Sequence, residues 1–399
     1  MGSSHHHHTD VAASPRAVRS ATVVLVVAAL VTLIGVVWLW PGALPKTGPA
    51  AAVPPTLVTG EVQAVDRSAC PDTVSTEAAA GCQVTVRLTD GPQAGKRIET
   101  QIPAGPGAPK VTRGDGVVLA YQPGSPDGNV YQITDHQRGV QLWILVAAFL
   151  LAVLAFGRMR GLRALAGLAV TFAALLFFIV PGILTGESPL LVAIVGSSAI
   201  MLTVLYLTNG IRLETSIAVL GTLAALALTG LLATLFTGIT HLTGIASDDD
   251  SYINVTYPGV DMRGLLLAGM IIGALGVLDD VTVTQAATVS ELAAANPSYT
   301  PRELYRAATR IGRAHIGSVI NTIILAYAGT SLPLLLLLVA GRTPTGQLLT
   351  DQLMAQELVR SGVGTIGLIA AVPITTALAA LTARYGIAGA AVRRGRHAG

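Results

Sequence analysis

Eight apolar stretches dominate the chain, each close to the roughly 20 residues that a helix needs to cross the hydrocarbon core of a bilayer. Of the 399 residues, 52% are apolar and only 12% are charged, a balance that excludes an ordinary soluble domain. We therefore predict a mainly α, polytopic membrane helix bundle of about eight transmembrane helices. The stretches lie near residues 20–40, 141–157, 164–184, 189–208, 215–237, 264–284, 315–340 and 362–383.

The stretches divide the chain into segments. Residues 1–19 hold an expression tag with four consecutive histidines, followed by a short N-terminal segment. The apolar stretch 20–40 is long and lacks a small-residue cleavage site, so we expect a retained anchor rather than a signal peptide. Seven further helices form the expected membrane domain, 141–385, and a basic tail follows at 386–399.

Arginine placement predicts the orientation, because basic residues in short loops resist translocation. If the N-terminus is cytoplasmic, only Arg263, Arg342 and Arg360 fall in the short outer loops of the last six helices. Both termini are therefore expected in the cytoplasm. The inner segments then hold Arg16, Arg19, Arg158, Arg160, Arg163, Arg212, Arg302, Arg306, Arg310, Arg313, Arg384, Arg393, Arg394 and Arg396.

The polar segment 55–137, between the first and second helices, has the pattern of a small extracytoplasmic all-β domain. Turns are expected at Asp90-Gly91 and at Gly114-Asp115-Gly116. Gating, partner docking, substrate delivery and a purely structural cap are all open as its role. Short strands of a barrel or sandwich are expected at 57–65, 82–88, 97–102 and 117–121.

Two cysteines, Cys70 and Cys82, lie in this outer segment. A disulfide between them suits an oxidising compartment and would contribute about 3 kcal/mol in the chain-entropy model. Two free thiols or a metal-binding pair are the alternatives, but no further ligand stands at metal-binding spacing, and no metal site is predicted.

Short motifs recur in the same order in helices three to five and six to eight, which suggests an inverted 3+3 repeat. Gly196-Ser197 corresponds to Gly317-Ser318, and the same alignment places Pro181-Gly182 opposite Thr282-Val283. Inverted repeats with interrupted helices are typical of secondary transporters. Plain helix-packing preference for small residues is the alternative explanation.

The sixth helix carries the most unusual residues, since its small and polar side chains recur every three or four positions and so share a face. Asp280, with Asp279 and the hydroxyls of Thr282 and Thr284, predicts a proton- or cation-coupling site. Alternatively, the span ends at the Asp pair and 281–295 forms a surface helix. The shared face consists of Gly269, Gly273, Gly276, Asp280, Thr284, Thr288 and Glu291.

The seventh helix offers partners for this site. Arg313 and His315 are candidate counter-ions to the Asp pair, although both are also consistent with solvated positions at a membrane boundary. Asn321, within an apolar span, is a candidate ion ligand, and interhelical hydrogen bonding is its plainer role.

A series of short motifs runs through the second half of the chain. They are His241-Leu242-Thr243-Gly244, Arg263-Gly264-Leu265, Gly273-Ala274-Leu275-Gly276, Asp280-Val281, Glu291-Leu292, Ile311-Gly312-Arg313, Gly317, Asn321-Thr322, Leu325-Ala326-Tyr327, and Glu357, Arg360, Gly364, Gly367 and Pro373. In these motifs the sequence resembles the YibE/F-like family of bacterial multi-span membrane proteins. The resemblance implies a bacterial plasma-membrane protein and supplies no activity. In the family pattern, an apolar residue is usual at Asp279 and an acidic one at Ala314.

We expect a secondary transporter or permease that moves a small solute or ion through the bilayer, coupled at Asp280. A non-transporting scaffold or accessory subunit, whose outer domain binds an envelope protein, is the alternative. An enzyme is not expected, because no nucleotide, nucleophile or zinc motif occurs, and no cofactor is predicted. Nucleic acid is not an expected partner, whereas a second copy of the chain remains a candidate.

Overall fold

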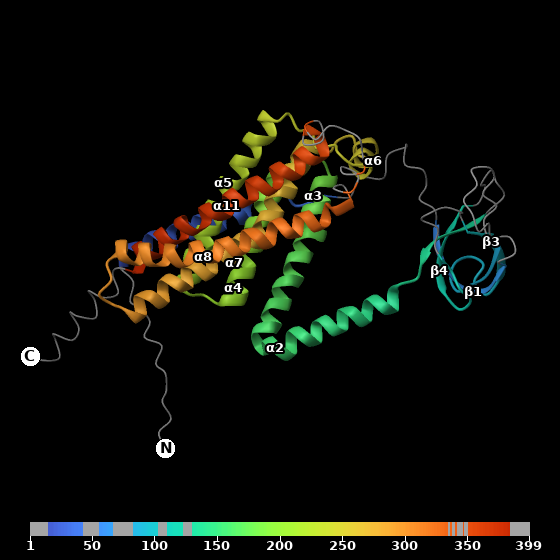
Figure 1. The fold of residues 1–399 in the computed structure, drawn as a ribbon, viewed down its shortest axis with the longest axis horizontal. Coiled ribbons are helices and arrows are strands. Elements are labelled where there is room, and N and C mark those ends of the chain that lie inside the picture. Colours follow the sequence, from blue (N-terminus) through green and yellow to red (C-terminus); the bar gives the residue numbers. More distant parts are fainter. Residues whose placement is uncertain are drawn as a thin grey trace, which may run out of the picture. The chain divides into compact units, whose positions relative to one another are not determined.

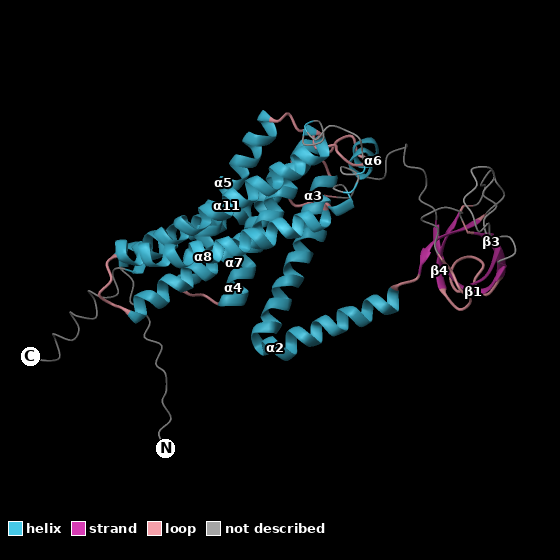
Figure 2. Ribbon diagram, in the orientation of Figure 1, coloured by secondary structure: helices cyan, strands magenta, loops and turns pink. Residues whose placement is uncertain are grey.

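The computed structural model is mainly helical and contains one small β-sheet (Figures 1 and 2). The chain divides after Arg158 into two compact units: the strands and the first part of α2 form one, and the remaining helices form the other. The structure describes residues 15–42, 56–66, 83–102, 110–122, 130–333 and 350–383, together with residues 336, 340 and 346.

Five antiparallel strands form the sheet, in the order β3-β2-β1-β4-β5. Their bounds are β1 Thr56–Asp66, β2 Gln83–Leu88, β3 Arg97–Gln101, β4 Gly116–Tyr121 and β5 Tyr131–His136. The hydroxyl of Thr100 donates to the carbonyl of Tyr131 at 2.5 Å, which brings the two edge strands together. The sheet is therefore a half-barrel, and the four predicted strands are confirmed. The fifth, β5, escaped prediction because only Tyr131 and Ile133 face inward.

Alternating side chains fill the half-barrel, as expected for strands with one buried face. Its core is made of Val58, Val62, Val84, Val86, Leu88, Ile102, Val111, Val117, Leu119, Tyr131 and Ile133. Both predicted turns are present, and Gly91 and Gly114 each adopt a φ of +94°, which favours glycine. At the end of the sheet, Arg138 donates to Asp135 at 2.6 Å, which lowers the pKa of that carboxyl.

The helical elements follow the predicted spans with differences at their ends. The predicted spans 264–284 and 362–383 are extended, because α7 begins at Met262 and ends at Ala295 and α11 begins at Gln352. The bounds are α1 Pro15–Trp38, α2 Gly139–Ala174, the π-helical turn η2 Leu175–Ile179, α3 Val180–Leu184, α4 Pro189–Asn209, α5 Leu213–Ile239, α6 Asp248–Thr256, α7 Met262–Ala295, α8 Pro301–Thr330 and α11 Gln352–Ala383.

Six helical segments are long and apolar enough to cross a membrane within the part of the chain that the structure describes. The longest, Gly139–Leu184, comprises α2, η2 and α3 and has 46 residues, or about 69 Å of helix, which is twice a hydrocarbon core. It has room for the predicted spans 141–157 and 164–184, which are separated by a non-helical Arg158 (φ 48°, ψ −126°). The predicted span 315–340 extends past the described residues, so the total of eight stays a prediction.

The break expected at Pro181-Gly182 takes the form of a π-helical turn. The helix continues through Pro181 as α3, directly after η2. Proline has no N–H to donate and its ring crowds the preceding turn, and the wider turn relieves both effects. The ring of Phe178 in η2 lies 6.1 Å from that of Trp40.

The helix α7 has no corresponding break, because it runs continuously past Thr282 and Val283. Two interrupted helices at matched positions are therefore not found. The inverted repeat itself stays a prediction.

The centre of the helical unit is a bundle of α5, α7 and α11, with α4 packed along α7 (Figure 1). Glycines let α5 and α11 approach closely: Gly221 lies against Thr375, and Gly367 lies against Thr229. These reciprocal contacts fix the two helices as antiparallel neighbours, and small residues at such contacts are typical of membrane helix pairs.

Candidate functional site

The buried side of α7 is held by polar contacts to three other helices. The hydroxyl of Thr282 lies 2.6 Å from that of Thr222 on α5, and both residues are fully buried. The amide Nε2 of Gln285 donates to the carbonyl of Ala308 on α8 at 3.0 Å and to the hydroxyl of Thr376 on α11 at 2.8 Å. These bonds set the rotation of α7 and therefore determine which residues face outward.

The outward side of α7 consists of small and polar residues. We define the polar face of α7 as Gly269, Gly273, Gly276, Asp280, Thr284 and Glu291, all of which are exposed. Asp279 is half-buried at its edge, and so is Thr288. Thr282, predicted as an oxygen ligand beside Asp280, lies on the opposite, buried side of the helix. It is therefore not part of this face.

Among the described residues, no helix packs on the glycines of the polar face. A Cβ placed on Gly269 or Gly276 would meet no atom within 4 Å, and one on Gly273 would meet only the hydroxyl of Tyr327, at 4.0 Å. Within the described part of the chain, the glycine half of the polar face is therefore open.

The residues after the Asp pair belong to the bundle. Their inward side chains pack with α5, α8 and α11 around Ala286, Val289 and Ala293, so 281–295 is not a helix separate from the bundle. The alternative that the span ends at the Asp pair stays a prediction. Near the end of α7, the hydroxyl of Ser290 donates to Glu214, the second residue of α5, at 2.5 Å. Asp280 lies ten residues earlier, about 15 Å along the helix from the level at which α5 begins.

The three candidates on α8 are all exposed: Arg313, His315 and Asn321. Gln285 on α7 is hydrogen-bonded to Ala308 on α8, and the two helices are antiparallel. Asp280 lies five residues before Gln285 and Arg313 lies five residues after Ala308, so the two are at about the same level. No ion pair joins the Asp pair to Arg313 or His315 in the described part of the structure. The structure therefore brings these groups to one level without bringing them into contact.

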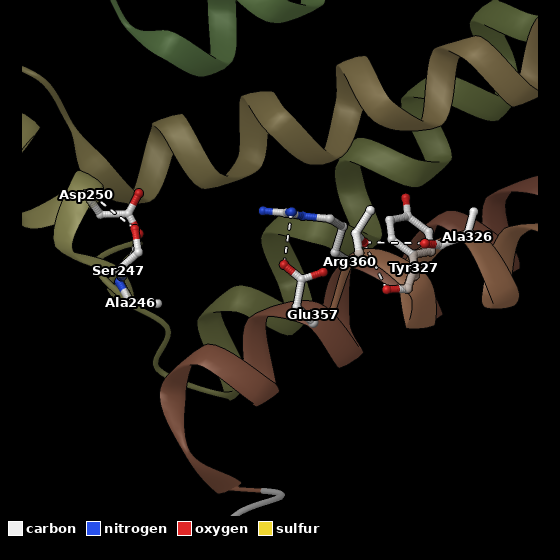
Figure 3. Close-up of polar contacts among 8 residues, drawn as sticks. Ala246, Ser247, Asp250, Ala326, Tyr327, Glu357 and Arg360 are labelled. Carbon is white, nitrogen blue, oxygen red and sulfur yellow. Dashed lines mark hydrogen bonds and ion pairs between the residues drawn. The ribbon is translucent and has the colours of Figure 1, made fainter. Parts of the chain in front are cut away.

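An ion pair that no functional prediction included lies near the other end of the polar face. Arg360 donates to Glu357 at 3.0 Å on α11 (Figure 3), and both side chains are partly buried. The helices α7 and α11 run parallel, and Gln285 on α7 contacts Thr376 on α11. Gly269 and Arg360 each lie 16 residues before this contact, so they are at the same level. The spacing of three residues was a signal in the sequence, but it gave no indication of burial.

Buried donors without partners accompany this pair. The Nε of Arg360 and the Nε2 of Gln356 make no hydrogen bond within the described residues. The side chain of Gln356 is 5% exposed. A buried donor of this kind costs free energy unless water or a ligand accepts from it.

The other predicted binding groups are the two cysteines and the oxygen atoms of the polar face. Cys70 and Cys82 both lie outside the described residues, and their disulfide stays a prediction. No group of three or more His, Cys, Asp or Glu side chains in the described segments is arranged to hold a metal ion. The polar face offers two carboxylates, Asp280 and Glu291, and the hydroxyl of Thr284 as cation or proton acceptors.

Comparison with known proteins gives one match. A family model described as "YibE/F-like protein" matches residues 145–385, more than half of the chain, and this region contains the polar face, Arg313 and Arg360. No curated protein and no solved structure matches the chain.

Proposed function

The chain belongs to the YibE/F-like family, and from this premise we propose that it is a membrane permease for a small solute or ion. The path runs along the polar face of α7, and Asp280 is the proton- or cation-coupling group. The observation that carries the proposal is an exposed carboxylate in a helix whose other side is fully packed.

An exposed Asp280 does not suit a lipid-facing position. Placing Asp at the centre of a membrane helix costs about 2.5–3.5 kcal/mol on insertion scales, so such residues face water or protein. The distance of about 15 Å between Asp280 and the level at which α5 begins favours a position within the bilayer, toward the inner side, where Arg313 lies at the same level. An aqueous path along the polar face satisfies the carboxylate and leaves the opposite side of α7 packed.

Polar groups along the length of α7 extend this path. The pair of Arg360 and Glu357 lies level with Gly269, Asp280 follows near the middle, and Glu291 lies toward the other end. A solute or ion that crosses the bilayer needs such groups in succession, because each replaces part of its hydration.

We place the protein in a bacterial cytoplasmic membrane with both termini inside. The excess of arginine in the inner segments supports this orientation. The half-barrel, which connects α1 to α2, is then extracytoplasmic.

The proposal is tested by thermal unfolding of the detergent-purified protein across pH and with Na⁺, K⁺ and Mg²⁺. A coupling ion at 100 times its Kd should stabilise the wild type by about 2.7 kcal/mol, and Asp280→Asn should remove this gain. Asp249→Asn, which neutralises an exposed acid on α6, is the matched control and should respond as the wild type does.

Equal responses of wild type and Asp280→Asn would exclude Asp280 as the coupling site. Cross-linking of a Gly276→Cys variant adds a second criterion. Efficient disulfide formation between two copies in native membranes would mean that a second chain covers the polar face, and the permeation path along it would be wrong.

An accessory subunit is the second candidate function, and the half-barrel favours it because the sheet has its own core and belongs to a separate compact unit. Such a module can bind an envelope protein independently of the helices. Stoichiometric co-purification of one envelope protein, lost when the half-barrel is deleted and unaffected by Asp280→Asn, would favour this function over transport.

A further inference from the structure

The first half of α8 and the loop before it line an open surface pocket of about 510 Å³. We call it the arginine pocket, and its proposed role does not depend on the proposed permease function. Its lining consists of Tyr299, Glu303, Tyr305, Arg306, Ala307, Thr309, Arg310 and Arg313.

Three arginines give the pocket its charge. Arg306, Arg310 and Arg313 are four and three residues apart, so they share one side of α8, and all are exposed. The opposite side of the helix packs into the bundle through Leu304, Ala308 and other buried residues. None of the three arginines has a carboxylate within 4.0 Å among the described residues.

The acid in the lining is already engaged. The carboxylate of Glu303 accepts from the backbone N–H and the hydroxyl of Thr300, both at 2.8 Å, as part of a capping box. The backbone hydrogen bond is the main cause of a lowered pKa at Glu303, so this group stays ionised. One such carboxylate leaves the pocket with a net excess of two positive charges.

Neutral side chains complete the lining. Tyr299, Tyr305 and Thr309 also line the pocket, and the hydroxyl of Thr309 is itself buried. Guanidinium groups match the oxygens of phosphate with two parallel hydrogen bonds. Three arginines on one side of the helix therefore suit a compact, multiply bonded anion rather than a single carboxylate.

We propose that the arginine pocket binds the phosphate group of a phosphorylated ligand. The ligand is either a soluble phosphate compound or the headgroup of an anionic phospholipid, and both present the same oxygens to the three arginines. Arg306, Arg310 and Arg313 hold the anion, and Glu303 limits its affinity by repulsion.

The test is binding measured by the thermal unfolding midpoint of the full-length protein in neutral detergent. One arm titrates inorganic phosphate at constant ionic strength maintained with NaCl. The other titrates phosphatidylglycerol in mixed micelles, with phosphatidylcholine as the comparison. A saturable shift in the first arm identifies a soluble ligand, and a shift in the second alone identifies a lipid headgroup.

Variants separate the pocket from general surface charge. Arg310→Gln should weaken binding about tenfold or more, because it removes charge-assisted hydrogen bonds. Arg302→Gln removes the same charge from the same helix outside the pocket, and should change the affinity less than about twofold, as expected for an exposed and screened charge. Arg310→Lys keeps the charge but loses the two-pronged geometry, and should bind between wild type and Arg310→Gln. Glu303→Gln should bind more tightly than the wild type.

Two results would overturn the proposal. One is equal loss of affinity in Arg302→Gln and Arg310→Gln, which would indicate nonspecific surface charge. The other is the absence of any saturable shift with both probes in a wild type that unfolds cooperatively. Since Arg310 is not part of the polar face of α7, neither result bears on the permease proposal.

Discussion

Thr282 and Thr284 lie two residues apart on α7 and have opposite surroundings. Thr282 is fully buried and contacts Thr222 across the bundle, whereas Thr284 is exposed on the polar face. A threonine therefore packs against a neighbouring helix at position 282, whereas a threonine at position 284 is available to a solute. Asp279 and Asp280 show a weaker form of the same contrast, since Asp279 is half-buried and Asp280 is exposed.

Replacing Thr282 with Val should lower the free energy of unfolding by about 0.6 kcal/mol, a typical value for a hydrogen bond between membrane helices. The loss is small because the hydroxyl of Thr222 also donates to Ala218 at 2.9 Å and keeps that partner. Denaturant unfolding in bicelles measures the change. Thr284→Val is the matched control, and a larger loss there than at Thr282 would contradict the assignment of the two sides.

Helices α5 and α11 illustrate how an element pair is specified. Each contributes a glycine opposite a threonine of the other, at Gly221 with Thr375 and at Gly367 with Thr229. Such contacts bring the two backbones close together and leave little room for a methyl group. The hydroxyl of Thr375 is buried there and makes no hydrogen bond among the residues described, so this contact is one of shape.

A methyl group at Gly221 should therefore be costly. Gly221→Ala would overlap Thr375 and should destabilise the protein by about 1–3 kcal/mol, as overpacking usually does. Adding Thr375→Ala should recover part of the loss, because it makes space for the new methyl group. Gly276→Ala meets no neighbouring atom and should change stability by less than about 0.5 kcal/mol. The same unfolding assay measures both variants. Equal losses of unfolding free energy for Gly221→Ala and Gly276→Ala would show that the close approach of α5 and α11 at Gly221 does not determine the cost.

The sequence predicted most helices and strands but not how each one is packed. Apolar runs predicted the helices because each run must be buried or face lipid, and the alternation of Val and polar residues predicted four strands. The polar half of α7 after Asp280 could not be placed, because Gln285 is buried only through contacts with residues 23 and 91 positions away. Likewise, the spacing of Asp280, Thr284 and Glu291 predicted a shared face, but not that the face is open.

At the scale of the whole molecule, the protein combines a bundle organised around α7 with a half-barrel that has a separate core. The family match covers residues 145–385, so it includes α7, α8 and α11 and excludes the half-barrel. The region that matches the family therefore includes the helices that carry the polar face and the arginine pocket.

The proposed orientation predicts which positions a membrane-impermeant maleimide reaches in intact bacteria. In a background without Cys70 and Cys82, Asp249→Cys should be labelled and Arg302→Cys should be protected until the membrane is permeabilised. The reason is the excess of arginine in the segments assigned to the inside. Labelling of Arg302→Cys but not Asp249→Cys in intact cells would invert the topology.

The buried contacts of Gln285 impose an order on biosynthesis. When α7 leaves the ribosome, α5 is already present and Thr282 can find Thr222. Gln285 can form its hydrogen bonds only later, because Ala308 and Thr376 follow it in the chain. A nascent protein that lacks both α8 and α11 thus carries a carboxamide without either of these partners, which is a mark by which quality-control proteases could distinguish incomplete chains from finished ones.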